Sequence, residues 1–349
     1  MIDPDIPAPV ANAAVKNCGK VSIRRLQAGM SGGTVAHCQA EDGRQYALKR
    51  WPSSIPRSRI EVIHRVVIHA WQQGCQAVAR PLKLHSGSDT SEMGSADTIL
   101  TIDGQNWELS PWRPGVAAKV DASLETIRQG GELIGQFHEA TASIQSLHQP
   151  APIIKERLAV LARRHRQLPL SPQLLDRRDL DTELSASLRD AANLIHWKWN
   201  EAQQQIHRSL IQQQDDGFAT QYVLRDVHAQ HILFAEGRAT GLIDFDAVRL
   251  DTPAADLARW AGSFLSAEHQ REEIWEAALE GYRTTCRLDR FGNERLLIQT
   301  AKNLCFAGTW LSLANWLAWL LIEQRDFEVP ARDLAERIYQ LIRIATADE

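Results

Sequence analysis

The sequence predicts an α+β fold of two lobes: a small antiparallel β-sheet with one helix in the N-terminal part, and a mainly helical C-terminal part. Three observations indicate this. Short β-branched or alternating segments joined by glycine-containing turns occupy residues 21–51 and 98–109. Helical spacing of apolar residues dominates from residue 121 onwards, interrupted by one hairpin within 220–245. The length of 349 residues suits two domains or one bilobed unit.

The composition is that of an ordinary globular protein. Hydrophobic residues make up 44% and charged residues 23%. The net charge of −4 gives no reason to expect a nucleic-acid partner. The five cysteines are scattered and have no C-x-x-C spacing, which argues against disulfides and zinc and favours a reducing compartment. Residues 1–18 contain prolines and lack the pattern of a signal peptide, so we expect a flexible tail and a cytoplasmic location.

One segment is long enough to span a membrane. Residues 304–322 carry no charge over 19 positions. The segment contains Gly308, Thr309, Ser312 and Asn315, and charged residues follow it immediately. A helix buried inside a helical lobe has the same composition, and we expect that placement and no membrane partner.

Three strands are predicted in the first lobe, at residues 21–27, 35–40 and 45–51. The first and second strands flank a glycine-rich loop, and Asp42-Gly43 is a favoured hairpin turn between the second and third strands. Glycine-rich loops let backbone N–H groups approach phosphates closely. Such a loop is more often only a turn, but Lys49 on the third strand makes a phosphate site the better interpretation.

A helix follows at residues 57–74, with an apolar stripe that includes Ile60, Ile63 and Val67. Glu61 is its one carboxylate and lies beside the stripe, whereas His64 lies on it. A second hairpin turns at Asp103-Gly104, and the connector after it leads into the helical part. We therefore place the domain boundary after residue 111, with lobes at 19–111 and 112–349.

The helical lobe contains an insertion at about residues 150–215 without a catalytic signature. It carries several basic residues that could attract an anionic substrate or could simply form a solvated helix face. A solvated helix face is the commoner explanation of such a pattern. The basic residues are Lys155, Arg157, Arg163, Arg164 and Arg166. His138, on the helix before the insertion, is predicted to be a core histidine.

The hairpin within 220–245 organises the chemistry. Its turn at Glu236-Gly237 pairs residues whose numbers sum to about 473. The loop carrying Asp226 and the segment carrying Asp244 therefore return to the same end, beside His231. Phosphoryl transfer needs one carboxylate to orient and deprotonate a hydroxyl and another to hold a metal on the phosphates.

The motifs here resemble those of kinases. Leu224-Arg225-Asp226-Val227 and Asp244-Phe245-Asp246 stand where protein kinases have H-R-D-L and D-F-G. Asp226-Val227-His228 and Ile243-Asp244-Phe245, followed by Asp256-Leu257-Ala258, resemble the aminoglycoside phosphotransferase/choline kinase family. The resemblance spans about residues 20–260 and implies a protein-kinase-like fold with ATP and Mg²⁺ as cofactors.

The resemblance also implies site roles. Asp226 would be the catalytic base, in a catalytic loop that includes Arg225 and His228. Nucleotide binding would fall to the glycine loop, the strand-three lysine, a helix glutamate that orients it, and the interlobe segment: Gly29, Ser31, Gly32, Gly33, Lys49, Glu61, Glu108 and Leu109. Asp244 would bind the metal.

Three departures from the family pattern affect this site. Leu224-Arg225 replaces the H-G pair, His231 stands where Asn is expected, and Asp246 replaces the glycine of D-F-G. Imidazole is a poor substitute for an oxygen ligand of Mg²⁺. An extended 244–246 segment would point Asp244 and Asp246 to the same side. We therefore expect Asp246 to join the metal site and His231 to contact phosphate or a metal-bound water.

The expected function is ATP-dependent phosphorylation of a small-molecule hydroxyl. Only 12 positions separate Asp244 from Asp256, which is short for the activation segment of a protein kinase. The alternative is an impaired kinase-fold protein that acts as a nucleotide-binding scaffold or regulator.

Overall fold

The structure is a computed structural model that describes residues 6–25, 32–84, 97–168, 181–214, 218–265, 269–291, 293–327 and 329–347. The chain divides into two units. The N-terminal unit comprises Met1–Ala117 and His231–Asp246, and the helical unit comprises Ala118–Gln230 and Ala247–Glu349. The first boundary therefore lies a few residues beyond the expected one. The predicted hairpin belongs to the N-terminal unit although it is distant in sequence.

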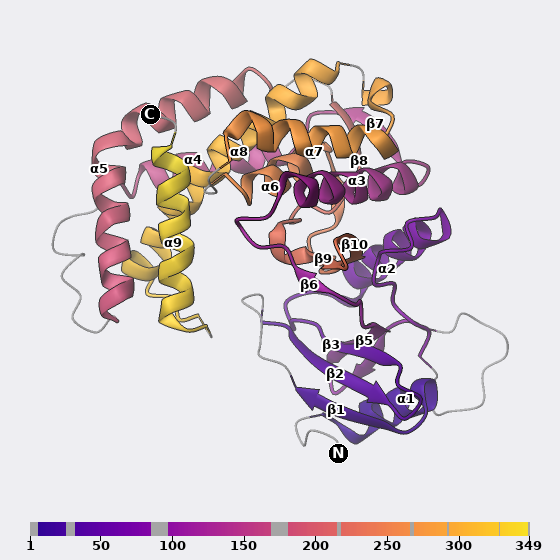
Figure 1. Cartoon of the computed structure of the whole chain (residues 1–349). Helices are drawn as coiled ribbons and strands as arrows, with labels where there is room; N and C mark the ends of the chain where they lie inside the picture. The colour runs from indigo at the N-terminus through magenta and orange to yellow at the C-terminus, as the bar shows by residue number, and fades with distance from the viewer. Residues whose placement is uncertain are drawn as a thin grey trace. The chain divides into compact units, whose positions relative to one another are not determined.

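The N-terminal unit is built on a five-stranded antiparallel sheet in the order β1-β2-β3-β5-β4 (Figure 1). The strands are β1 (Val21–Arg25), β2 (Thr34–Ala40), β3 (Gln45–Arg50), β4 (Leu100–Ile102) and β5 (Gln105–Pro111). Helix α2 (Arg57–Gln72) follows β3 and buries the predicted apolar stripe. The strands, the helix and the Asp103-Gly104 turn predicted from the sequence are confirmed, apart from residues 26 and 27 of the first predicted strand, which lie outside the described residues.

The expected flexible tail is wrong for residues 8–18, which form helix α1 (Ala8–Cys18). Pro9 lies in the first turn, where a missing N–H costs no helical hydrogen bond, and Gly19 ends the helix at φ 76°. Val10 and Ala14 are buried in the same core as Trp107 of β5. The sequence prediction treated the prolines as helix breakers and missed this apolar face.

The hairpin formed by β9 (Ile232–Ala235) and β10 (Arg238–Leu242) pairs with β6 (Val116–Ala117). Its register matches the prediction: Arg238 faces Ala235, a sum of 473, and a bulge shifts the later pairs to 474. Glu236 and Gly237 both have positive φ, 51° and 75°, as a tight hairpin turn requires. The turn therefore determines the position of Asp244, which follows the second strand of the hairpin.

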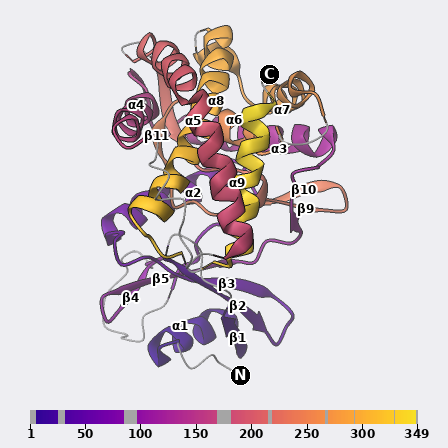
Figure 2. The same ribbon diagram turned by 90° about the vertical axis from the view of Figure 1, so that its left-hand side faces the viewer.

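The helical unit places seven helices around a small sheet of β11-β8-β7 within the described residues. The helices are α3 (Leu124–Thr141), α4 (Pro152–His165), α5 (Thr182–Ile211), α6 (Ala254–Gly262), α7 (Arg271–Thr285), α8 (Glu294–Leu317) and α9 (Ala331–Thr346). The strands are β7 (Ser146–Gln149), β8 (Phe218–Val223) and β11 (Arg249–Asp251). Helices α5 and α9 run side by side in both ribbon views (Figure 2).

Helices α3 and α7 approach each other closely because glycines line their contact. A Cβ on Gly281 would lie 1.7 Å from the backbone oxygen of Arg128, and one on Gly131 would lie 2.2 Å from that of Ala278. The helices can pack at this distance only without side chains at both positions.

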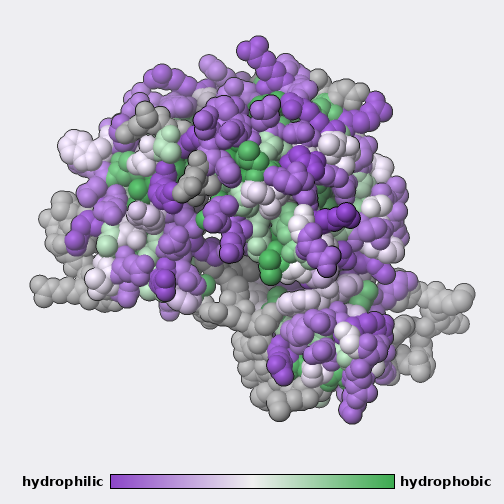
Figure 3. Space-filling view, viewed as in Figure 1, coloured by the Kyte–Doolittle hydropathy of each residue, from purple (hydrophilic) through white to green (hydrophobic). Residues whose placement is uncertain are grey.

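The apolar segment predicted as a core helix lies within α8 and its π-helical continuation (Ala318–Ile322). Glu294–Ile322 is long and apolar enough to cross a membrane by length and composition, and 67% of its most apolar window is buried inside the unit. Trp316 packs edge-on against Trp319, with ring centroids 5.3 Å apart. Hydrophilic residues predominate on the face of the molecule in Figure 3, with small apolar patches between them.

Candidate active site

The N-terminal unit contains a cavity of about 340 Å³. Apolar residues of β2, β3, α2 and β9 form much of its wall, including Val35, Ala47, Val67 and Leu233. Residues 110–113, the last two residues of β5 and the two that follow, also line the cavity. Polar lining comes from Lys49, His64, Glu108, Asp244 and Asp246. A mostly apolar cavity with a few convergent charged groups is the usual form of a small-molecule site.

Lys49 on β3 is the centre of the charged groups. Its Nζ forms an ion pair with Asp246 and lies 3.9 Å from Oδ1 of Asp244. Oδ2 of Asp244 lies 3.5 Å from Nε2 of His231. The expected placement of His231 beside Asp244 is therefore present within this unit, and Lys49 lies beside both Asp244 and Asp246.

The segment after β10 turns and does not continue as an extended strand. Asp244 has φ 62°, in the left-handed region that non-glycine residues seldom adopt. The expectation of an extended 244–246 segment is therefore wrong, although both carboxylates do face Lys49. Such a conformation costs about 1–3 kcal/mol and persists only where the surrounding packing compensates it. Conformations of this kind are concentrated at functional sites.

Burial and charge act against each other at this cluster. Burial raises the pKa of Asp246, which the Lys49 ammonium partly offsets. Burial disfavours the charged form of Lys49, but the carboxylates of Asp246, Glu108 and Asp244 together raise its pKa. A cationic lysine beside two closely spaced carboxylates results.

The carboxylate of Glu108 points into the cavity. Glu108 faces Lys49 in the β3–β5 register, and its Oε2 lies 2.5 Å from Nε2 of His64 on α2. The indole N–H of Trp51 donates to the same oxygen at 2.9 Å. Burial opposes ionisation of Glu108, but His64 and Lys49 outweigh it and lower its pKa. The resemblance predicted nucleotide binding for Glu108 as part of the interlobe segment and gave no role to its carboxylate.

Glu61 does not take the position expected from the resemblance. Its carboxylate accepts from Nε of Arg57 at 3.1 Å and is half exposed, and Glu61 does not line the cavity. The helix contributes His64 at the cavity, and β5 contributes the carboxylate. Strand pairing between β3 and β5 brings Glu108 to Lys49, although α2 and β4 lie between these strands in sequence.

The remaining predicted nucleotide-binding residues divide into three groups. Gly29 and Ser31 lie outside the described residues. Gly33 lines the cavity, and Gly32 beside it is exposed with φ 77°. Leu109 points to the opposite face of the sheet, where it is fully buried, while its carbonyl accepts from the N–H of Leu82 at 2.7 Å.

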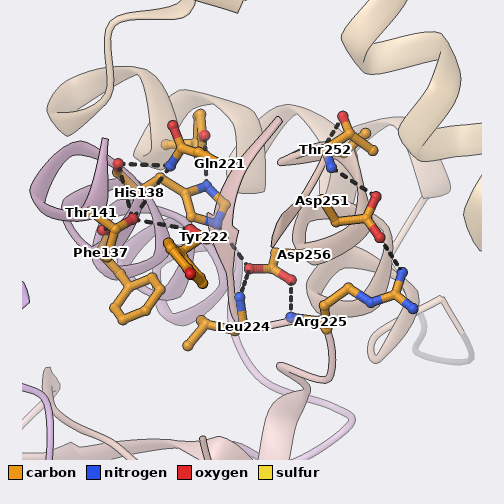
Figure 4. Close-up of polar contacts among 12 residues, drawn as sticks. Phe137, His138, Thr141, Gln221, Tyr222, Leu224, Arg225, Asp251, Thr252 and Asp256 are labelled. Atoms are coloured by element: carbon orange, nitrogen blue, oxygen red, sulfur yellow. Dashed lines mark hydrogen bonds and ion pairs between the residues drawn. The ribbon is translucent and has the colours of Figure 1, made fainter. Parts of the chain in front are cut away.

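The loop that carries Asp226 belongs to the helical unit and is held by Asp256. Asp256 is fully buried and accepts hydrogen bonds from the N–H groups of Leu224 and Arg225 at 2.7 and 2.6 Å (Figure 4). Nε2 of His138 donates to it at 2.8 Å, and Nδ1 of His138 lies 2.8 Å from the Tyr282 hydroxyl. The core placement predicted for His138 is confirmed, and the loop-holding role of Asp256 was missed.

Arg225 uses its side chain to attach the loop to neighbouring elements. Its guanidinium donates to Asp251 at 2.7 Å and forms an ion pair with Glu156. Asp251 also accepts from the N–H groups of Ile153 and Thr252. Burial raises the pKa of Asp251 to about 6, against the lowering effect of Arg225. Arg225 has φ 70°, so the loop turns sharply just before Asp226.

Asp226 is half exposed, and Arg259 of α6 donates to its carboxylate at 2.5 Å. Nδ1 of His228 accepts from the N–H of Gln230 at 3.3 Å, which shapes the loop after Asp226. The structure thus gathers Arg225, Asp226 and His228 in the helical unit. That Asp226 and Asp244 act on one substrate stays a prediction.

The donors around Asp244 fit a metal only in part. In the described parts of the chain, no group of three or more His, Cys, Asp or Glu side chains is arranged to hold a metal ion. Asp244 and Asp246 supply carboxylate oxygens, the ligand type that Mg²⁺ prefers. Mg²⁺ commonly uses one or two carboxylates and completes its shell with phosphate oxygens and water.

Known proteins resemble this chain at the level of family and fold. The sequence model of the phosphotransferase enzyme family matches residues 22–288. No curated protein sequence matches the chain. Among solved structures, spectinomycin phosphotransferase in complex with ADP and spectinomycin has a TM-score of 0.67 at 14% identity, covering 99% of each chain.

Two further structures are similar. An amicoumacin kinase in complex with AMP-PNP and Ca²⁺ has a TM-score of 0.61 at 13% identity and covers 93% of this chain and 88% of that one. A glucosamine kinase in complex with glucosamine, ADP and phosphate has a TM-score of 0.56 at 14% identity, covering 97% and 84%. The α+β, kinase-like fold predicted from the sequence is confirmed.

Proposed function

Because the chain belongs to the phosphotransferase enzyme family, we propose that it transfers the γ-phosphate of ATP to a hydroxyl group of a small molecule. The observation that carries the proposal is the cluster of Lys49, Asp244, Asp246 and His231 at the charged part of the cavity. A lysine beside two carboxylates suits a nucleotide whose phosphates carry a divalent cation.

In this proposal the apolar walls of the cavity receive the adenine ring of ATP, and Lys49 contacts its phosphates. Asp244 and Asp246 would hold Mg²⁺, which when bound neutralises phosphate charge. His231 would contact a phosphate oxygen. Glu108 takes the part that the resemblance gave to Glu61, because its carboxylate faces Lys49 and is held by His64 and Trp51.

Asp226 is proposed as the base. Its carboxylate accepts the proton of the acceptor hydroxyl while that oxygen forms a bond to the γ-phosphorus and the bond from phosphorus to the bridging oxygen of ADP breaks. Arg225 and Asp256 position the loop through the contacts described above. Neither of these two contacts the reacting groups in this proposal.

The scaffold alternative has one observation in its favour. The Lys49 ammonium is already paired with Asp246, at the position where the family pattern has glycine. A protein that binds nucleotide without turning it over would keep such a pair.

The test is phosphate transfer from ATP to a panel of sugars, amino alcohols, hydroxy acids and aminoglycosides, with Asp226→Ala as the comparison. A general base contributes roughly 10²–10⁴-fold to the rate, so a loss of that size is expected. ATP binding without transfer to any acceptor would favour the scaffold.

The five free, buried cysteines agree with the cytoplasmic location proposed here.

A further inference from the structure

The structure separates the basic residues of α4 that the sequence grouped together. Arg164 is fully buried and structural, since it donates to Asn315 at 2.7 Å and to Glu323 at 2.8 Å. Lys155, Arg163 and Arg166 are exposed. For those three the solvated helix face is the correct interpretation. Arg157 fits neither description.

Arg157 is partly buried and poorly matched. Its Nε is inaccessible to solvent and has no hydrogen-bond partner among the described residues. Burial, with repulsion from Arg259 and Arg225, lowers the pKa of Arg157 to about 10, despite the attraction of Glu156 and Asp226. A buried N–H without an acceptor is costly, so the unsatisfied Nε of Arg157 requires an explanation such as an acceptor supplied by a ligand or by water.

The neighbouring arginines already have partners. Arg225 pairs with Asp251 and Glu156, Arg249 donates to Glu156 at 3.2 Å, and Arg259 pairs with Asp226. Four arginines thus meet three carboxylates in the helical unit. The surplus positive charge belongs to Arg157.

The location of this surplus matters. Arg157 follows Glu156, and Glu156 pairs with Arg225, the residue before Asp226, so the unmatched guanidinium lies near the proposed base. The charges of Asp226 and Arg259 act on Arg157 accordingly. An arginine fork recognises a carboxylate or phosphate through two parallel hydrogen bonds. A cationic acceptor would instead meet like charge here.

We propose that Arg157 binds an anionic group of the acceptor, a carboxylate or a phosphate, and so brings the acceptor's hydroxyl to Asp226. This inference rests on the proposed function and names the substrate class of that site. The acceptor would be a hydroxy acid or a phosphorylated polyol in preference to an amino sugar.

The test compares acceptors that differ only in the anionic group: gluconate with glucose, and glycerate and glycerol 3-phosphate with glycerol. We expect kcat/KM to favour an anionic member by about 10²-fold, the usual size of a desolvated charged contact. Glycerate and glycerol 3-phosphate distinguish a carboxylate from a phosphate source. In Arg157→Met the ratio falls to about 1, and Arg157→Lys restores it in part because the charge returns without the fork.

Arg163→Met, on the exposed side of the same helix, is the matched control and should leave the ratio unchanged. If Arg157 were merely structural, Arg157→Met would have a lower melting temperature than the wild type. An unmatched buried charge predicts an equal or higher melting temperature.

Failure of this inference is distinguishable from failure of the proposed function. Transfer that depends on Asp226 but is indifferent to Arg157, or that favours the neutral acceptors, overturns the inference alone. If no acceptor is phosphorylated, calorimetric binding of gluconate, glycerate and glycerol 3-phosphate to the wild type and Arg157→Met decides. Binding lost in the variant supports the anion site, and equal or absent binding overturns it.

Discussion

Replacing Asp256 tests whether one buried carboxylate holds the loop that carries Asp226. It accepts three hydrogen bonds at 2.6–2.8 Å, from the N–H groups of Leu224 and Arg225 and from His138. Asp256→Ala leaves all three donors without an acceptor in a fully buried position. Each unsatisfied buried donor costs about 1–3 kcal/mol, so the free energy of unfolding should fall by about 3–9 kcal/mol. Because domains are typically stable by about 5–15 kcal/mol, this loss is a large part of the total stability.

Asp256→Asn separates charge from shape. The amide oxygen can still accept two of the three hydrogen bonds, but the amide nitrogen faces the third donor. We expect a loss of about 1–3 kcal/mol, because one donor is unsatisfied and the charge-assisted bonds become neutral ones. Phosphate transfer should fall further than stability alone explains, since Asp226 directly follows Arg225.

The assay is urea unfolding followed by tryptophan fluorescence, with Trp260 on the same helix as a buried reporter. Asp190→Asn, at an exposed position of α5, is the control and should change the free energy of unfolding by less than about 0.5 kcal/mol. If both Asp256 variants unfold with the wild-type free energy, the loop is not held in this way.

Three other predictions follow from particular contacts. Gly281→Ala should lower the free energy of unfolding by at least about 1–3 kcal/mol, because its Cβ would lie 1.7 Å from the oxygen of Arg128, whereas Gly308→Ala, with no atom within 4 Å, should not; thermal unfolding compares them. Glu108→Gln should weaken ATP binding roughly tenfold in calorimetry, as expected for one charged contact to Lys49, while Glu61→Gln should not, and the reverse result would restore the helix glutamate. Asp251 has a pKa raised from 3.8 to about 6 by burial, so its bound proton stabilises the folded state below pH 4 and this contribution is lost as the pH rises to 6. The unfolding free energy of the wild type relative to Asp251→Asn should therefore fall between pH 4 and 6 by up to about 1.4 kcal/mol per pH unit, and a flat difference would refute the raised pKa.

Local patterns carried much of the fold. The hairpin at Glu236-Gly237 and its register followed from turn chemistry and alternation, and both are matched by the structure. Lys49 was found because the glycine loop and strand before it are local features. Motif spacing placed Asp226 and Asp244 on the segments flanking the hairpin.

Features set by distant packing were not accessible in the same way. Glu108 reaches Lys49 through pairing of β3 with β5, which no local pattern specifies. Helix α1 is stabilised by an apolar face that meets the sheet, so its prolines gave the wrong signal. Arg157 and Arg164 have the same residue type on one helix, and only tertiary contacts distinguish them. A helical-wheel count on α4 could have shown that the basic residues do not share one face.

The central claim is that the charged part of the cavity receives the phosphates and metal of the nucleotide. Calorimetric titration of ATP, with and without Mg²⁺, into the wild type, Lys49→Met and Asp246→Asn tests it most directly, with exposed Lys20→Met as control. We predict that Lys49→Met loses ATP affinity and that the Mg²⁺ enhancement seen with the wild type shrinks in Asp246→Asn, while Lys20→Met matches the wild type. ATP affinity that is the same in all four proteins, with or without Mg²⁺, would contradict the account.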